Sequence, residues 1–150
     1  MIRPANERDI AQLINLGHMM HEESRHYWRA LDDDAVETFV LTMLNSSNMF
    51  LWVAEREGRV TGFFAGLLAG VWYSTARLAQ DVCLYVEPAS RGSLDGVRLI
   101  NRFIEWGREH GADEIIIEND AAVPNSPIGM VLTRMGMDRV GEIYSMRVRK

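Results

Sequence analysis

The chain has 150 residues, of which 47% are hydrophobic and 25% charged, proportions typical of one soluble globular domain with a sizeable core. The net charge of −5 disfavours nucleic-acid binding, and no apolar run is long enough to span a membrane, so we expect neither as a partner. The single cysteine, Cys83, excludes an internal disulfide, and no signal-peptide pattern is present, which together predict a cytoplasmic protein.

The first half of the chain predicts a strand, two helices and a hairpin. Residues 1–3 form the strand, and Asn6 with Asp9 gives a capping-box-like start to a helix that ends near Met20 or His21. Three aspartates at 32–34 cap a second helix, which ends at residues 45–48. Two apolar strands, 49–55 and 60–71, are joined by a turn in which Gly58 can take a positive φ.

Residues 78–107 predict a strand, a turn and a helix. Residues 78–86 are apolar enough for a buried strand, which Pro88 ends. Within residues 97–107, the apolar residues and Gly107 recur at helical spacing. The turn between them holds Arg91, Gly92 and Gly96. Because the first-turn amides of a helix have no intrahelical partner and glycines permit close approach, this turn predicts a phosphate or pyrophosphate site. A surface turn with a chance arginine is the alternative.

The last third predicts a strand at 114–118, a loop, and a helix that starts at Ser126-Pro127 and stops at Gly136. Residues 137–149 then supply one or two final strands. The whole order is β-α-α-β-β-β-α-β-α-β.

This order resembles the GNAT superfamily of acetyl-CoA-dependent N-acetyltransferases over essentially the whole chain. The resemblance rests on three stretches: Ile2-Arg3-Pro4-Ala5 with Asp9, Val86-Glu87-Pro88 before Arg91-Gly92, and Asn125 eleven residues before Gly136. It implies one GNAT-like α/β (α+β) domain over residues 1–150, with a mixed, mostly antiparallel sheet of six to seven strands flanked by four helices. The sequence departs from the family pattern at Leu94, which replaces a glycine, at Leu132, which replaces a tyrosine, and at Met137, which replaces a phenylalanine.

The resemblance also implies a function. It implies transfer of an acetyl group from acetyl-CoA to a primary amine of a small molecule or protein. The implied acetyl-CoA site comprises Leu84, Tyr85, Val86, Arg91, Gly92, Ser93, Leu94, Asp95, Gly96 and Asn125. A catalytically silent acyl-CoA-binding or protein-interaction module on the same scaffold is the alternative that Leu94 and Leu132 suggest. The sequence leaves open whether the chain is a monomer or a homodimer.

Acetyl transfer requires a base, because an amine with a pKa near ~10 must lose a proton before it attacks a thioester. Asp81, ten residues before Arg91 in an apolar strand, is the preferred base, and an aspartate satisfied by backbone amides is the equal alternative. Glu118, acting through water, is a weaker candidate. Tyr144 and Tyr85 are candidate acids for the thiolate, although a buried tyrosine bonded to backbone is the better explanation of each.

In the resembled family the first two helices and their connection form one wall of the acceptor groove, which implies that residues 18–34 help to bind a cationic amine. The carboxylates of Glu22 and Glu23 would attract a cation, and the rings of Tyr27 and Trp28 suit an ammonium group or an alkyl stem. The alternative for the aromatic pair is that it covers the core. Three histidines at 18, 21 and 26 raise the question of a metal. Only His18 and His21 could share a helix face, and a zinc site generally needs a third or fourth placed ligand, so we expect no metal site.

Overall fold

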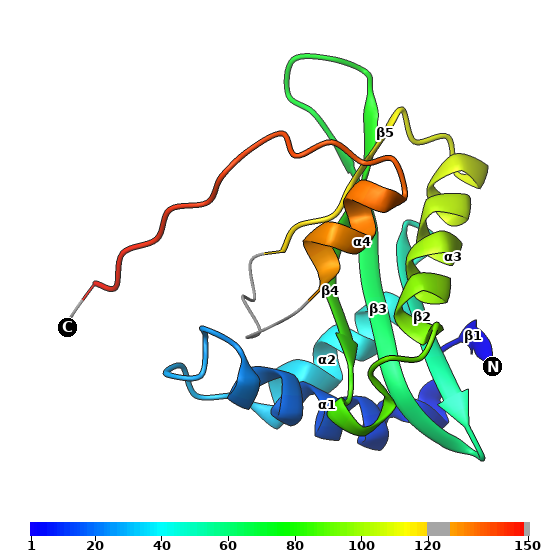
Figure 1. Cartoon of the computed structure of the whole chain (residues 1–150), viewed down its shortest axis with the longest axis vertical. Helices are drawn as coiled ribbons and strands as arrows, with labels where there is room; N and C mark the ends of the chain where they lie inside the picture. The colour runs from blue at the N-terminus through cyan, green and yellow to red at the C-terminus, as the bar shows by residue number, and fades with distance from the viewer. Residues whose placement is uncertain (120–126, 149–150) are drawn as a thin grey trace.

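The computed structural model describes residues 1–119 and 127–148 (Figure 1). The elements in chain order are β1 (Ile2–Pro4), α1 (Ile10–Glu23), α2 (Asp33–Leu44), β2 (Met49–Arg56), β3 (Arg59–Gly70), β4 (Arg77–Val86), α3 (Asp95–Glu109), β5 (Glu114–Ile116) and α4 (Ile128–Arg134). A single 3₁₀ turn at Glu7–Asp9 precedes α1, and another at Pro88–Ser90 lies between β4 and α3. Among the described residues, no helix is long and apolar enough to cross a membrane.

The strands form one five-stranded sheet in the order β1-β2-β3-β4-β5. Every pair is antiparallel except β4 with β5, which run parallel. The expected mixed, mostly antiparallel sheet with four flanking α-helices is therefore confirmed in the described part of the chain. The expectation of six to seven strands is wrong, because the sheet in the described residues has five.

The missing strands were expected within residues 137–149. Residues 138–148 are instead extended, exposed and outside the sheet, as Figure 1 shows. The segment has strand-like alternation, but a strand also needs a neighbour for its backbone N–H and C=O groups. No neighbouring strand pairs with this segment among the described residues.

Local signals explain where the elements begin and end. The Asn6 side chain accepts the N–H of Arg8, and the Asp9 carboxylate accepts the N–H of Asn6, which completes the predicted capping box. Asp32 caps α2 by accepting the N–H of Ala35 at 3.1 Å. Gly136 closes α4 with a φ of +88°, a conformation that glycine adopts without strain.

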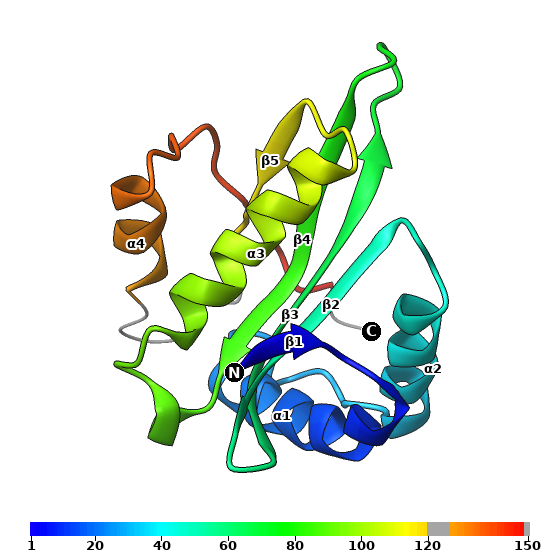
Figure 2. The same cartoon turned by 90° about the vertical axis from the view of Figure 1, so that its right-hand side faces the viewer.

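Helices cover both faces of the sheet (Figure 2). On one face, α1 and α2 bury Leu13, Leu16, Val40 and Met43 against β2 and β3. On the other face, α3 and α4 bury Phe103, Trp106 and Leu132 against Phe50 and Phe64. Leu132, which replaces the family's usual tyrosine, is therefore a core residue here. Gly66 makes room for Phe103, since a Cβ atom at Gly66 would lie 2.4 Å from that ring.

Candidate functional site

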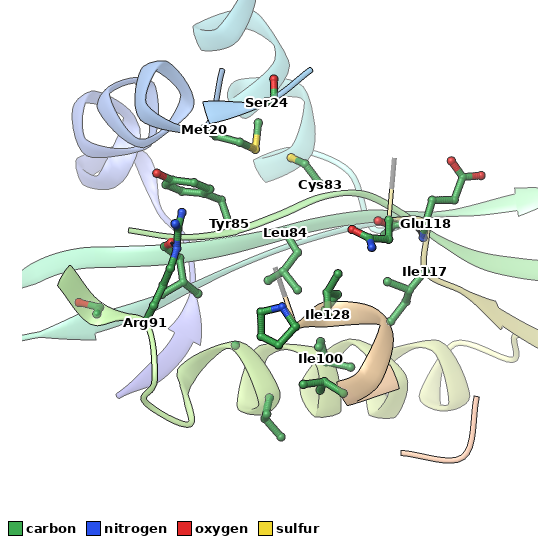
Figure 3. Close-up of a pocket in the computed structure, with 18 of the residues that line it drawn as sticks. Met20, Ser24, Cys83, Leu84, Tyr85, Arg91, Ile100, Ile117, Glu118 and Ile128 are labelled. Atoms are coloured by element: carbon green, nitrogen blue, oxygen red, sulfur yellow. Dashed lines mark hydrogen bonds between the residues drawn. The ribbon is translucent and has the colours of Figure 1, made fainter. Parts of the chain in front are cut away.

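The candidate site is a cavity where β4 and β5 part. The two strands pair only through residues 78–80 of β4, so the edge of β4 from Asp81 to Val86 has no strand beside it in the described chain. A cavity of about 380 Å³ opens along this edge. It is lined by residues from the end of α1, β4, the following turn, α3, the chain after β5, and α4 (Figure 3). An open strand edge offers backbone amide and carbonyl groups to a ligand.

A β-bulge shapes the strand wall of the cavity. Ala65 pairs with Cys83 and Gly66 with Asp81, so Val82 is the extra residue in β4. Asp81 lies next to this bulge and lines the cavity together with Glu118. One Asp81 carboxylate oxygen accepts the backbone N–H of Glu118 at 2.8 Å. The predicted base and the weaker candidate therefore lie together at one end of the cavity, and Asp81 also makes the backbone contact that the alternative interpretation expected.

The turn between β4 and α3 forms the other end. Arg91, Gly92, Ser93 and Gly96 line the cavity, and Gly92 has a φ of +84°. Leu94 does not line the cavity, and its side chain is 61% exposed to solvent. The first turn of α3 has no side-chain cap at Leu94. Gly96 and Val97 of this turn line the cavity, where a helix N-terminus beside glycines favours an anion.

Asp95, predicted in the acetyl-CoA site, has its carboxylate directed elsewhere. The side chain is 3% exposed and accepts a hydrogen bond from the Arg56 guanidinium at 2.7 Å. Burial opposes ionisation of this carboxyl, but the Arg56 hydrogen bond and charge outweigh it and hold its pKa below the ordinary value. The backbone N–H of Asp95 donates to the Ser93 hydroxyl at 3.3 Å, so Asp95 stabilises the turn and does not itself line the cavity.

Arg91 connects the turn to α1. Its guanidinium donates two hydrogen bonds to the Glu23 carboxylate, at 2.7 and 2.9 Å, and a third to the carbonyl of Val86 at 2.9 Å. The Tyr85 hydroxyl also donates to Glu23. The bonds from Arg91, and secondarily the one from Tyr85, lower the pKa of Glu23, while burial and then the Glu23 bond raise the pKa of Tyr85. The guanidinium fork expected to face phosphate is thus occupied by a carboxylate.

Two buried carboxylates hold the turn to the β2–β3 hairpin. Glu87, 6% exposed, accepts two bonds of 2.6 Å from Arg59 and one of 2.9 Å from Ser90. Asp95 accepts from Arg56 at the other side of the same hairpin turn. The sequence contained both arginines and both acids, but nothing in their spacing indicated that residues about 30 to 40 positions apart form pairs.

The predicted acceptor residues do not line the cavity. Glu23 accepts hydrogen bonds from Tyr85 and Arg91, which do line it, whereas Glu22 is exposed. Tyr27 and Trp28 are 65% and 43% exposed on the α1–α2 connection, where the Arg147 guanidinium lies over both rings. Met20, Ser24 and His26 line the cavity instead, although their sequence context gave no sign of it.

Two further predicted residues lie away from the cavity or outside the described chain. Tyr144 is 87% exposed on the C-terminal segment, and its hydroxyl donates to Glu142. Asn125 falls outside the described residues.

Comparisons with known proteins agree with the fold described above. A family model described as "Acetyltransferase (GNAT) family" matches residues 16–126. Among solved structures, a transcriptional regulator from Bacillus halodurans is similar, with 20% identity over 99% of both chains and a TM-score of 0.81. The aminoglycoside N-acetyltransferase AAC(6')-Iy, solved with a CoA bisubstrate analogue, has 18% identity over 100% of this chain and 98% of its own, with a TM-score of 0.78.

A predicted acetyltransferase from Clostridium acetobutylicum, solved with acetyl-CoA, gives 18% identity over 98% of this chain and 95% of its own, with a TM-score of 0.78. At these identities the structures establish a common fold. A search of curated protein sequences finds no significant match. The family match confirms acetyl-CoA as the expected cosubstrate, and the chain belongs to the GNAT acetyltransferase family.

Proposed function

We propose that this protein is an acetyl-CoA-dependent N-acetyltransferase that acts on a primary amine of a cationic acceptor. One observation carries the proposal: the open edge of β4, the first turn of α3 and Asp81 border a single cavity. The phosphates and the thioester arm of acetyl-CoA would therefore meet the turn and the strand edge, and the amine would meet the proposed base, within one cavity.

For acetyl-CoA, the backbone supplies most of the proposed contacts. The amides at Gly92, Ser93 and Gly96 would receive the pyrophosphate, since the helix dipole and unpaired N–H groups favour an anion there. Residues 84–86 would pair with the pantetheine amides as an added strand would. Arg91 contributes positive charge and, through Glu23, fixes the turn against α1.

For the chemistry, Asp81 is the proposed base. It borders the cavity, and its hydrogen bond from the Glu118 backbone fixes the orientation of one carboxylate oxygen. As the base, Asp81 would accept the proton of the amine, directly or through one water. Leu132 is buried in the core, Tyr144 lies on the exposed segment, and the Tyr85 hydroxyl donates to Glu23, so none of the three supports a protein acid for the thiolate in this conformation. We therefore assign no side chain to that step.

The cationic acceptor is inferred from the charges at the cavity. Asp81 and Glu118 are the carboxylates that line its β5 end, whereas the Arg91 charge at the other end is already paired with Glu23. Carboxylates beside a binding site raise the encounter rate of a cation, most strongly at low salt. The similarity to AAC(6')-Iy, and to a metagenomic aminoglycoside acetyltransferase solved with sisomicin, supports polycationic amines as the first acceptors to test.

Acceptor charge is tested by kinetics with three groups of primary amines. We expect kcat/KM to fall from polyamines and aminoglycosides, through zwitterionic amino acids, to glutamate. Glu118→Gln should raise KM for the polycations, whereas Glu22→Gln, an exposed acid outside the cavity lining, serves as the matched control. A preference for glutamate, or an unchanged KM in Glu118→Gln, would contradict a cationic acceptor held by this wall.

A second candidate is a catalytically silent acyl-CoA-binding module. The observation that favours it is the burial of Leu132 at the position where the family often has a tyrosine. Calorimetry with acetyl-CoA does not separate the two candidates, because both bind it. Release of free CoA in the presence of an amine does, because only the enzyme breaks the thioester.

A further inference from the structure

The Arg91 side chain lies against one end of the open β4 edge. Its Nε donates to the carbonyl of Val86 at 2.9 Å, and its guanidinium carbon lies 5.4 Å from the centre of the Tyr85 ring. Figure 3 shows Arg91 beside Tyr85 at one end of the cavity, with Ile117 and Glu118 at the other. Arg91 therefore occupies the part of the strand edge that adjoins the turn before α3.

The Val86 carbonyl belongs to the open edge of β4. Hydrogen-bonded and non-hydrogen-bonded positions alternate along an antiparallel pair of strands. The N–H of Glu87 donates to the carbonyl of Thr61 at 2.9 Å, so the backbone groups of Glu87 face β3. Those of Val86, and of Leu84 two residues earlier, face the open edge instead. The pantetheine amides of the proposed cosubstrate would therefore compete with the Arg91 side chain for the Val86 carbonyl.

Glu23 holds Arg91 in this position. Its two carboxylate oxygens accept hydrogen bonds from the two terminal guanidinium nitrogens, at 2.7 and 2.9 Å. The Tyr85 hydroxyl donates to the same carboxylate. A guanidinium binds a phosphate through the same two-pronged geometry. Glu23 therefore occupies the Arg91 donors that a phosphate would use.

The ion pair is exposed enough to be exchanged. The side chains of Arg91 and Glu23 are 39% and 27% exposed, and ion pairs with this access to water contribute little to stability. A pyrophosphate carries more negative charge than a carboxylate, so it competes well for the guanidinium. After the exchange, Glu23 would keep the Tyr85 hydroxyl and its contact with water, so no buried charge would be left without a partner.

We propose that Glu23 is an internal competitor for acetyl-CoA. Its carboxylate holds the Arg91 side chain on the strand edge. The pyrophosphate of acetyl-CoA displaces that carboxylate, so Arg91 turns to the phosphates and the Val86 carbonyl becomes free for pantetheine. This role rests on the proposed acetyl-CoA site. Because CoA has the same pyrophosphate and pantetheine arm, Glu23 lowers the affinity for cosubstrate and product alike, and its return to Arg91 favours release of CoA.

The first test is calorimetric titration with CoA, which binds without turnover. Glu23→Gln removes the competing charge and should bind CoA about two- to fivefold more tightly than the wild type, the range expected for an exposed ion pair. Glu22→Gln removes the same charge from the exposed neighbouring position and should leave the affinity unchanged. Equal or weaker binding by Glu23→Gln, or an equal gain in Glu22→Gln, would overturn the proposal.

The second test repeats the titration in an Arg91→Gln background. The gain from Glu23→Gln should largely disappear there, because the carboxylate then has no guanidinium to withhold from the phosphates. A gain of the same size in both backgrounds would mean that Glu23 acts on CoA through its charge alone. That result would refute exchange at Arg91.

CoA binding and acetyl transfer give separate answers. Unchanged CoA affinity in Glu23→Gln, with acetylated amine formed by the wild type, would refute the competitor and leave the enzyme. Tighter CoA binding by Glu23→Gln, without acetyl transfer to any amine, would support the competitor and refute the enzyme. Absence of CoA binding to both proteins would refute both.

Discussion

The ion pair between Arg59 and Glu87 should respond asymmetrically to removal of either partner. The Glu87 side chain is 6% exposed, whereas that of Arg59 is 59% exposed. Arg59→Met leaves a buried carboxylate without its cation and with only the hydrogen bond from Ser90, and a stranded buried charge is strongly destabilising. Glu87→Gln leaves an arginine that water can solvate, so its cost is that of the lost charge-assisted hydrogen bonds, about 1.5–3 kcal/mol. Arg59→Met should therefore be the more destabilising change.

The assay is chemical denaturation of both variants and of the double variant. The double variant should be about as stable as Glu87→Gln alone, because no charge is then stranded. Arg98→Met is the matched control: Arg98 is 58% exposed, and its partner Asp95 keeps its bond to Arg56, so the expected cost is about 0–1 kcal/mol. The reasoning is refuted if Arg59→Met costs no more than Glu87→Gln or than the control.

Three further predictions concern the base, the sheet and pH. Asp81→Asn should lower kcat with little change in acetyl-CoA affinity, and the acid limb of the pH–rate profile should shift or disappear; an equally active variant would make Asp81 structural. Gly66→Ala should lower the melting temperature measured by circular dichroism, because its Cβ would lie 2.4 Å from the Phe103 ring; Gly129→Ala, where nothing lies within 4 Å, is the control. The lowered pKa of Glu87 stabilises the fold above the ordinary value of 4.5, and this contribution is lost as pH falls through the folded-state pKa, so denaturation of Glu87→Gln should depend less on pH in that range.

Local sequence signals determined most of the fold. The capping box at Asn6, the hairpin at Gly58 and the apolar run before Pro88 each depend on neighbouring residues, and the structure confirms them. The segment after Met137 also has a strand pattern, but pairing depends on a distant edge that alternation alone cannot supply. The prediction of strands there was wrong for the described chain.

The candidate site was predictable only in part, for the same reason. The strand, the turn and Asp81 are close in sequence, and their joint place on the cavity follows from a local strand–turn–helix unit. Arg91 appeared free to bind phosphate because its partner, Glu23, lies 68 positions away. Long-range ion pairs leave no periodic trace in a sequence. The arginines that anchor the turn, Arg56 and Arg59, were missed for that reason.

Thioester turnover tests the central claim most directly. Acetyl-CoA is incubated with a polyamine or an aminoglycoside, and free CoA and the acetylated amine are measured together. The proposed function predicts that CoA and acetylated amine appear in equal amounts, that neither forms without an amine, and that Asp81→Asn slows both. Tight binding of acetyl-CoA with no CoA release for any amine would contradict the enzyme and leave the silent binding module.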